Sequence, residues 1–163
     1  MSLGLGSGWG PVIGAVAWGV ATLGVGGALT EIGPWYRGLK KPRWQPPDLL
    51  FGPAWTIIIV CACWALVLAW NRAPGVPERA MVVTLFMLNG MLNAGWSLFF
   101  FKWRRPDWAL IEVVPLWLSI GLLILECSAM TTRGALLLVP YLAWVSFAAF
   151  LNLTIVRLNA KFG

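Results

Sequence analysis

Histidine is absent from the 163-residue sequence, and charged side chains make up only 11% of it. Without His, the chain lacks the most common protein ligand of metal ions, and one of the usual axial ligands of haem iron. We therefore expect neither redox haem chemistry nor a resident metal centre. Soluble domains of this size are typically about a quarter charged, so the scarcity of charge also excludes an ordinary water-exposed globule.

Cysteine is scarce as well. Cys61, Cys63 and Cys127 all fall within long apolar segments, where no soluble redox machinery acts. A disulfide framework or a zinc site is therefore not expected from these spacings. We interpret the three thiols as packing residues.

Hydrophobic residues, by contrast, make up 60% of the sequence and include 12 Trp. A membrane-spanning helix needs about 20 apolar residues, and the chain has five segments of that kind, four of them free of charge. Backbone in lipid must be helical unless it closes into a barrel, and the sequence lacks the alternating ten-residue pattern of barrel strands. We predict an all-α integral membrane protein, a single domain over residues 1–163 built as a five-transmembrane-helix bundle. The expected helices cover about residues 10–30, 49–71, 80–101, 108–130 and 134–156.

The basic residues are distributed unevenly between the connections. Nine of the 12 fall in the first loop, the third loop and the C-terminal tail: Arg37, Lys40, Lys41, Arg43, Lys102, Arg104, Arg105, Arg157 and Lys161. The other connections hold Arg72, Arg79 and Arg133. Because cytoplasmic loops carry the excess of Lys and Arg, we expect the first loop and C terminus in the cytoplasm and the N terminus outside. This asymmetry accounts for the net charge of +6 and leaves no support for a nucleic-acid partner.

The longest connection, residues 31–48, combines proline with aromatic residues. Its prolines fix φ and lack a backbone donor, so we expect a stiff segment without a helix. Beside Trp35, Tyr36 and Trp44 they indicate a rigid aromatic lid. An interfacial belt, in which Trp and Tyr accumulate at headgroup depth, explains the aromatic residues equally well.

Polar residues within the predicted spans form stripes together with aromatic residues. One helix face carries Asn89, Asn93, Trp96 and Phe100; another carries Tyr141, Trp144, Ala148 and Asn152, and Trp55 begins the second span. Facing inward, these stripes would enclose an apolar pocket with few polar anchors, which is typical of a small-molecule site. Alternatively, the amides bond helix to helix and the rings fill the core.

Two further features bear on packing. Glu112 lies near the start of the fourth span, and we expect it either to pair with Arg105 or to contact water at the interface. Gly90 and Ala94 form a small-residue step that permits close approach of helices. That step fits packing within one bundle or between two copies.

Several spaced motifs resemble the TspO/MBR family of translocator proteins and tryptophan-rich sensory proteins. The first is Trp35-Tyr36-x-x-Leu39-x-Lys41-Pro42-x-Trp44-x-Pro46-Pro47 with Gly52-Pro53-x-Trp55. The others are Asn93-x-x-Trp96-x-x-Phe99-Phe100, Trp108-Ala-Leu-Ile-Glu112 and Pro140-Tyr141-Leu142-Ala143-Trp144. They occur in order from the first loop to the last helix, so the resemblance covers nearly the whole chain.

The resemblance implies a five-helix bundle, often a homodimer, that binds porphyrins such as protoporphyrin IX beneath the first loop, with no obligatory cofactor. Carried over by position, the ligand-binding residues are Tyr36, Pro42, Trp44, Pro47, Trp55, Asn89, Asn93, Trp96, Tyr141, Trp144 and Ala148. In the family, light-dependent porphyrin breakdown is associated with the positions of Trp55 and Trp144. Phe150 occupies a position that is usually small, and would narrow the pocket or a dimer seam.

Two functions follow as hypotheses. In the first, the protein is a porphyrin sensor or carrier of a bacterial membrane that influences pigment or stress metabolism. In the second, it is a structural subunit that packs against a larger membrane complex, one that carries pigment for example. No nucleophile and base at a catalytic spacing are visible, so acid-base enzyme chemistry is not expected.

Overall fold

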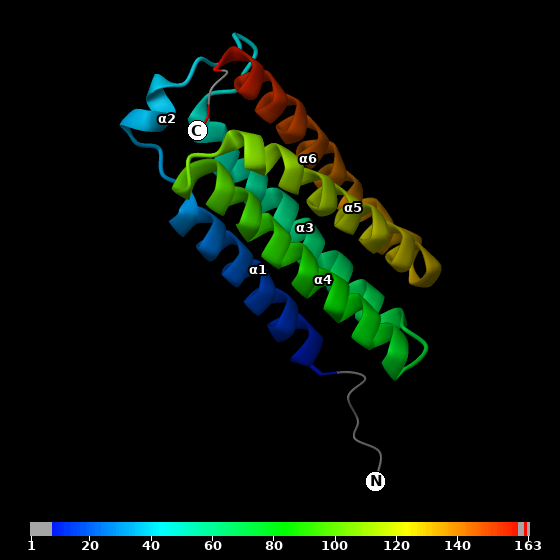
Figure 1. Ribbon diagram of the computed structural model, residues 1–163. Helices are drawn as coiled ribbons and strands as arrows, with labels where there is room; N and C mark the ends of the chain where they lie inside the picture. Colours follow the sequence, from blue (N-terminus) through cyan, green and yellow to red (C-terminus); the bar gives the residue numbers. More distant parts are fainter. Residues whose placement is uncertain (1–7, 160–161, 163) are drawn as a thin grey trace.

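The computed structural model describes residues 8–159 and residue 162. Its long helices, each apolar enough to cross a membrane, are α1 (Gly10–Leu29), α3 (Phe51–Arg72), α4 (Val76–Ser97), α5 (Pro106–Met130) and α6 (Thr132–Leu158). They run side by side as an elongated bundle (Figure 1). The predicted five-helix membrane fold is confirmed. Lys161 and both ends of the predicted 1–163 domain lie outside the described residues.

Proline sets the start of several helices. α4 begins at Val76 rather than near residue 80, because Pro77 occupies the first turn, where no backbone donor is needed, and the Glu78 carboxylate complements the helix dipole. In the same way α5 begins at Pro106, two residues before the expected start. Glu78 and Asp107 therefore lie in the first turns of α4 and α5. The charge-free runs had predicted that both helices begin further along the chain.

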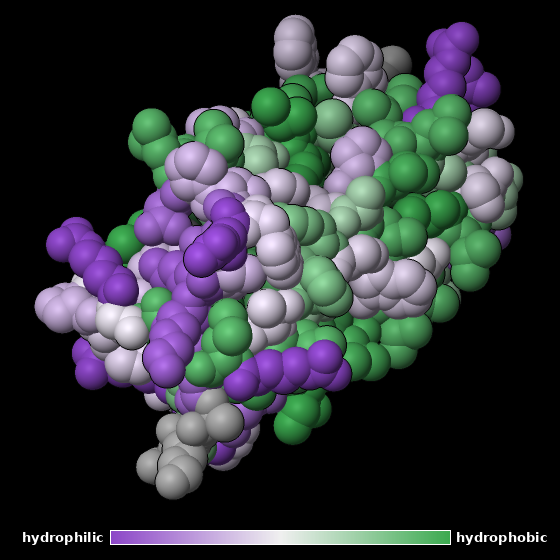
Figure 2. Space-filling model, turned by 90° about the horizontal axis from the view of Figure 1, so that it is seen from above, coloured by the Kyte–Doolittle hydropathy of each residue, from purple (hydrophilic) through white to green (hydrophobic). Residues whose placement is uncertain are grey.

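The bundle buries only a part of each helix. α1 packs on α3 and α4, while α5 packs on α4 and α6 (Figure 1). Large apolar side chains such as Ile57, Leu125 and Leu136 remain more than 60% exposed on the outside. On the face seen in Figure 2, hydrophobic residues cover much of the helices, and hydrophilic residues gather mainly at the end that carries α2. An apolar exterior of this kind suits contact with lipid chains.

The first loop departs from the predicted helix-free segment in one place. Pro34–Gly38 forms the short helix α2, since a proline at the first helical position loses no hydrogen bond. A 3₁₀ turn, η1 (Asp48–Leu50), leads directly into α3. The expectation that the prolines prevent any helix is therefore wrong at Pro34.

At its C-terminal end, α4 passes from α-helical into π-helical winding. Leu98–Lys102 forms the π-helical segment η2, and Arg104 follows with a φ of 56°. This left-handed residue turns the chain sharply toward α5. The short turn keeps α4 and α5 adjacent along their length, and Phe100 from η2 is buried beside the loop.

Gly90 lies where α4 meets α1. A Cβ atom at Gly90 would lie 2.9 Å from Trp18 Nε1 and 3.2 Å from Thr22 Oγ1. The Trp18 indole in turn donates a 2.8 Å hydrogen bond to the Phe86 carbonyl. Gly90 therefore serves packing within one bundle, and its missing side chain makes room for the Trp18 ring.

This close approach predicts that Gly90→Ala destabilises the protein. Overpacking of a filled interior costs about 1–3 kcal/mol. We expect a lower melting temperature in detergent, measured by intrinsic fluorescence. Gly121→Ala on α5 is the matched control, because a Cβ there meets nothing within 4 Å and Ala favours helix over Gly. An equal loss in both variants would contradict the packing role of Gly90.

Candidate functional site

A cavity of about 730 Å³ lies at the end of the bundle beneath the first loop. Its walls come from α1, α3, α4, η2 and α6, and the loop contributes Ile32, Tyr36, Asp48 and Leu49. Leu49 is 85% exposed, so the cavity opens where the loop enters α3. The volume falls in the usual range of small-molecule sites, about 300–1,000 Å³.

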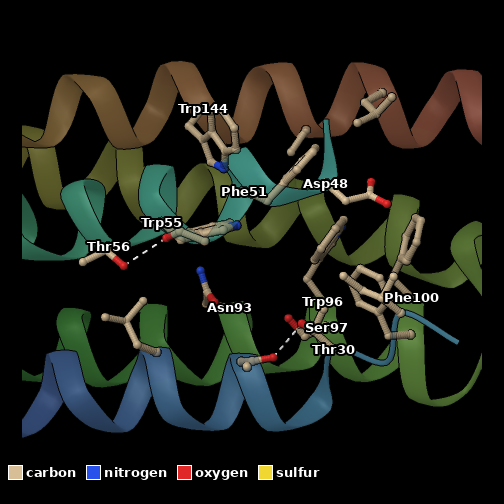
Figure 3. A pocket seen from close by; sticks show the side chains of 18 of the residues that line it. Thr30, Asp48, Phe51, Trp55, Thr56, Asn93, Trp96, Ser97, Phe100 and Trp144 are labelled. Carbon is tan, nitrogen blue, oxygen red and sulfur yellow. Dashed lines mark hydrogen bonds between the residues drawn. The ribbon is translucent and has the colours of Figure 1, made fainter. Parts of the chain in front are cut away.

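Aromatic rings form a part of the cavity wall: seven of its 25 lining residues are Trp, Phe or Tyr. Trp55 of α3 and Trp144 of α6 meet edge to face, with ring centroids 6.5 Å apart. Across the cavity, Trp96 stacks on Phe100 at 5.1 Å, and Asn93 lies one turn before Trp96 (Figure 3). The structure thus brings the predicted residues Trp55, Asn93, Trp96 and Trp144 around one space, together with Tyr36 and Ala148.

Two of the predicted site residues lie behind this wall rather than on it. Asn89 is fully buried and donates to the Ser119 hydroxyl at 2.9 Å, while Tyr141 is 1% exposed. The Tyr141 hydroxyl donates to Asn89 Oδ1 and accepts from Asn93 Nδ2, both at 3.0 Å. Because these groups satisfy one another, the expectation that Tyr141 lines the cavity is wrong, and it supports Asn93 from behind.

Two indole donors on the cavity wall lack partners. The Nε1 atoms of Trp96 and Trp144 are inaccessible to water and have no hydrogen-bond partner among the described residues. A buried N–H without an acceptor is unfavourable by about 1–3 kcal/mol. Because no molecule of the size of water reaches either nitrogen, these N–H groups cannot bond to an occupant of the cavity unless the rings rearrange.

The first helix contributes a side of the cavity that the sequence stripes did not predict. Thr22, Gly26 and Thr30 recur every four residues on one face of α1 and line the cavity. Their spacing was a usable signal, since small and hydroxyl residues at i, i+4 mark a single helix face. Ser97, four residues after Asn93, was missed in the same way.

Hydrogen bonds fold the first loop over the cavity. The Tyr36 hydroxyl donates to Asp48 at 2.9 Å, and Gln45 donates to the same carboxylate at 3.1 Å. Burial, and secondly this bond to Asp48, raise the pKa of Tyr36 above its usual range, so the phenol stays protonated at neutral pH. The Lys41 ammonium lies 3.6 Å from the centroid of the Tyr36 ring.

The rest of the predicted lid lies outside the cavity. Pro42, Trp44 and Pro47 are not among the residues that line it. Trp44 is 45% exposed and stacks at 5.3 Å on Phe150, which is itself 58% exposed on the outer face of α6. Phe150 therefore does not narrow the cavity. It anchors the outer part of the loop instead.

The predicted pairing of Arg105 with Glu112 is wrong. Arg105 makes a bidentate contact with Asp107, two residues along, and lies 4.6 Å from the centroid of the Trp108 ring. Glu112 is buried against α4, where its carboxyl group lies beside Gly95. Neither Glu112 oxygen has a hydrogen-bond partner among the described residues.

Sequence comparison agrees with this architecture. The profile of the TspO/MBR family matches residues 12–158, which is most of the chain. The chain belongs to the TspO/MBR family. It is 43% identical over 125 residues to Tryptophan-rich protein TspO of Chlorobaculum tepidum, covering 77% of this chain and 79% of the relative.

More distant relatives of the family carry other names. Translocator protein of Homo sapiens is 34% identical over 127 residues, covering 77% of this chain and 75% of the relative. Protein CrtK of Rhodobacter capsulatus is 30% identical over 139 residues, covering 85% and 87% of the two chains. The TspO/MBR fold of this protein is thus shared by relatives from bacteria and animals.

The buried network behind the cavity makes a prediction for Tyr141→Phe. Loss of the hydroxyl leaves Asn89 Oδ1 and Asn93 Nδ2 without their partner, at a cost of about 1–3 kcal/mol. We expect a clear drop in melting temperature in detergent. Tyr36→Phe is the control, because Asp48 keeps its bond to Gln45 at the water-facing loop. Similar falls in melting temperature for both variants would show that the buried network contributes no more to stability than the hydrogen bond of Tyr36 in the loop.

Proposed function

We propose that this protein is a membrane receptor or carrier for porphyrins, which bind in the cavity beneath the first loop. The observation that supports this most is the set of Trp rings, Trp55, Trp96 and Trp144, around a largely apolar space of about 730 Å³. A porphyrin is a flat apolar ring with acidic edges. Stacking on indole faces favours such a ring over compact or fully polar ligands.

A cationic side chain of the loop suits the acidic edge of that ligand. At the loop, Lys41 is held over Tyr36, a cavity residue, and forms no ion pair among the described residues. Its ammonium is therefore available to a propionate carboxylate. The chain has no His, which is one of the usual axial ligands of haem iron, and the proposed binding does not depend on a bond between the protein and iron.

The ligand proposal predicts a loss of affinity in Trp144→Ala. By analogy with stacking on nucleic-acid bases, removal of one stacked ring costs about 1–3 kcal/mol, or roughly a tenfold to hundredfold higher Kd. Quenching of Trp fluorescence by added protoporphyrin IX measures this for purified protein in detergent. The control is Trp64→Ala, because Trp64 is 61% exposed on the outside of α3.

Two results would contradict the proposal. Equal weakening in Trp64→Ala and Trp144→Ala would show that the porphyrin adheres to exposed rings or that the fold is perturbed. Absence of quenching, together with stoichiometric partner subunits in the purified protein, would favour the structural-subunit hypothesis. Exposed rings such as Trp103 would then be part of the contact with those subunits.

We also propose an orientation in which the loop end faces the cytoplasm. The loop that contains α2, the turn after η2 and the end of α6 lie at one end of the bundle (Figure 1), and eight of the nine basic residues assigned to that side are among the described residues. The opposite end has Arg72, Arg79 and Arg133. The excess of Lys and Arg at the loop end favours a cytoplasmic location for that end of the bundle.

A reporter fused after Gly163 tests the orientation. We expect a cytoplasmic signal from that fusion and an external signal from a reporter placed before Met1, because Lys and Arg near the spans resist translocation. Alkaline phosphatase and green fluorescent protein fusions in a bacterial host measure the two sides. An external C-terminal signal would reverse the assignment.

A further inference from the structure

A second cavity, of about 250 Å³, lies far from the first loop, where the N-terminal half of α1 meets α3 and α4. Its lining is almost wholly apolar and includes Pro11, Ala15, Leu66, Val83, Phe86 and Met87. On α1, Gly10 and Gly14 belong to it, and a Cβ at either would meet nothing within 4 Å. These glycines leave a groove beside the helix rather than a packed contact.

The groove is closed at its inner end and runs toward the membrane surface. Trp18 donates to the Phe86 carbonyl at 2.8 Å, and the two rings meet edge to face at 5.1 Å. From Gly10 to Trp18 the helix rises about 12 Å, at about 1.5 Å per residue. This depth approaches half of the roughly 30 Å hydrocarbon layer, which is the share of one lipid leaflet.

Polar groups appear only at the outer end. The Trp70 ring lines the groove there, and the Arg79 guanidinium carbon lies 5.5 Å from its centroid. Trp70 Nε1 and Arg79 Nε are inaccessible to water and lack hydrogen-bond partners among the described residues. Arg79 forms no ion pair within the same part of the chain. These two nitrogens are enclosed by protein, but the Arg79 guanidinium group as a whole lies next to the apolar groove without a carboxylate partner among the described residues.

We propose that this groove binds one anionic phospholipid, with an acyl chain between α1, α3 and α4 and the phosphate at the Arg79 guanidinium. The apolar lining and the leaflet depth suit a single chain, and an arginine without a carboxylate partner among the described residues suits a phosphate oxygen. Arginine recognises phosphate through several N–H groups, and anionic lipid adds a favourable charge interaction. The groove is separate from the cavity beneath the loop and shares no lining residue with it.

A bound chain would also complete the packing of α1. In lipid, helices associate through close packing rather than through the hydrophobic effect, and a void lacks those contacts. Apart from the chain neighbours and the backbone of the same helix, no atom of the described residues lies within 4 Å of a Cβ added at Gly10 or Gly14, so this side of α1 is open. An ordered acyl chain supplies atoms there, so the lipid acts as a structural ligand of the first helix.

Native mass spectrometry of the detergent-purified protein, titrated with phosphatidylglycerol or phosphatidylcholine of the same acyl chains, tests the proposal. We expect tighter binding of phosphatidylglycerol. Arg79→Gln should weaken phosphatidylglycerol about tenfold and reduce its preference over phosphatidylcholine, because a charged hydrogen bond to the phosphate and the attraction to the net negative headgroup are both lost. Gly14→Leu should weaken both lipids, because its side chain fills the groove.

Two matched variants control for general effects. Arg133→Gln removes another arginine at the same end, and Gly24→Leu adds the same side chain to α1 where a Cβ also meets nothing within 4 Å. Both should bind lipid as the unaltered protein does, and melting temperatures in lipid-free detergent check folding. Equal losses of phosphatidylglycerol affinity in Arg79→Gln and Arg133→Gln would show that the effect comes from general surface charge and not from a specific contact. Unchanged binding in Gly14→Leu would place the lipid elsewhere and overturn the proposal.

Discussion

The cavity beneath the loop depends on the hydrogen bonds that link Asn89, Tyr141 and Asn93 inside the bundle. In hydrocarbon a polar side chain must find a partner within the protein, so these groups fix the relative positions of α4 and α6, and Ser119 extends the link to α5. With the helices held at this level, the rings one turn away cannot close on one another. The open space beside Asn93 is thus a consequence of the satisfied polar groups behind it.

Trp residues have three different roles in this bundle, and their environment rather than their identity decides which. Trp18 is a wedge, because its N–H reaches a carbonyl of another helix. Trp96 and Trp144 line the cavity, which makes their rings candidates for ligand contact. Trp64 and Trp103 face outward, and of these two only Trp103, after the end of η2, has the end-of-span position where indoles accumulate.

Much of the fold follows from the sequence because the membrane imposes a simple length and charge rule. The scarcity of charge identified five spans, and the stripe of residues three and four apart correctly placed Asn93 and Trp96 on one face. The sequence could not show that Tyr141 lies behind the cavity wall. A stripe shows which face of a helix a residue is on, but not how deeply its side chain is buried. Nor did spacing identify the partner of Arg105, because Asp107 is closer than Glu112 and sequence distance alone does not rank them.

The first loop is fastened at its margins by exposed contacts. Glu31 pairs with Lys102 at 2.6 Å, and this partner lowers the pKa of the Glu31 carboxyl, while Lys40 exchanges two 2.8 Å hydrogen bonds with Asn159. Exposed ion pairs contribute little to stability and weaken as salt is added. These exposed contacts therefore contribute less to stability than the buried hydrogen bonds of Asn89, Asn93 and Tyr141 below them. Higher ionic strength thus weakens the ion pair at the margin of the loop and leaves the buried hydrogen bonds below it in place.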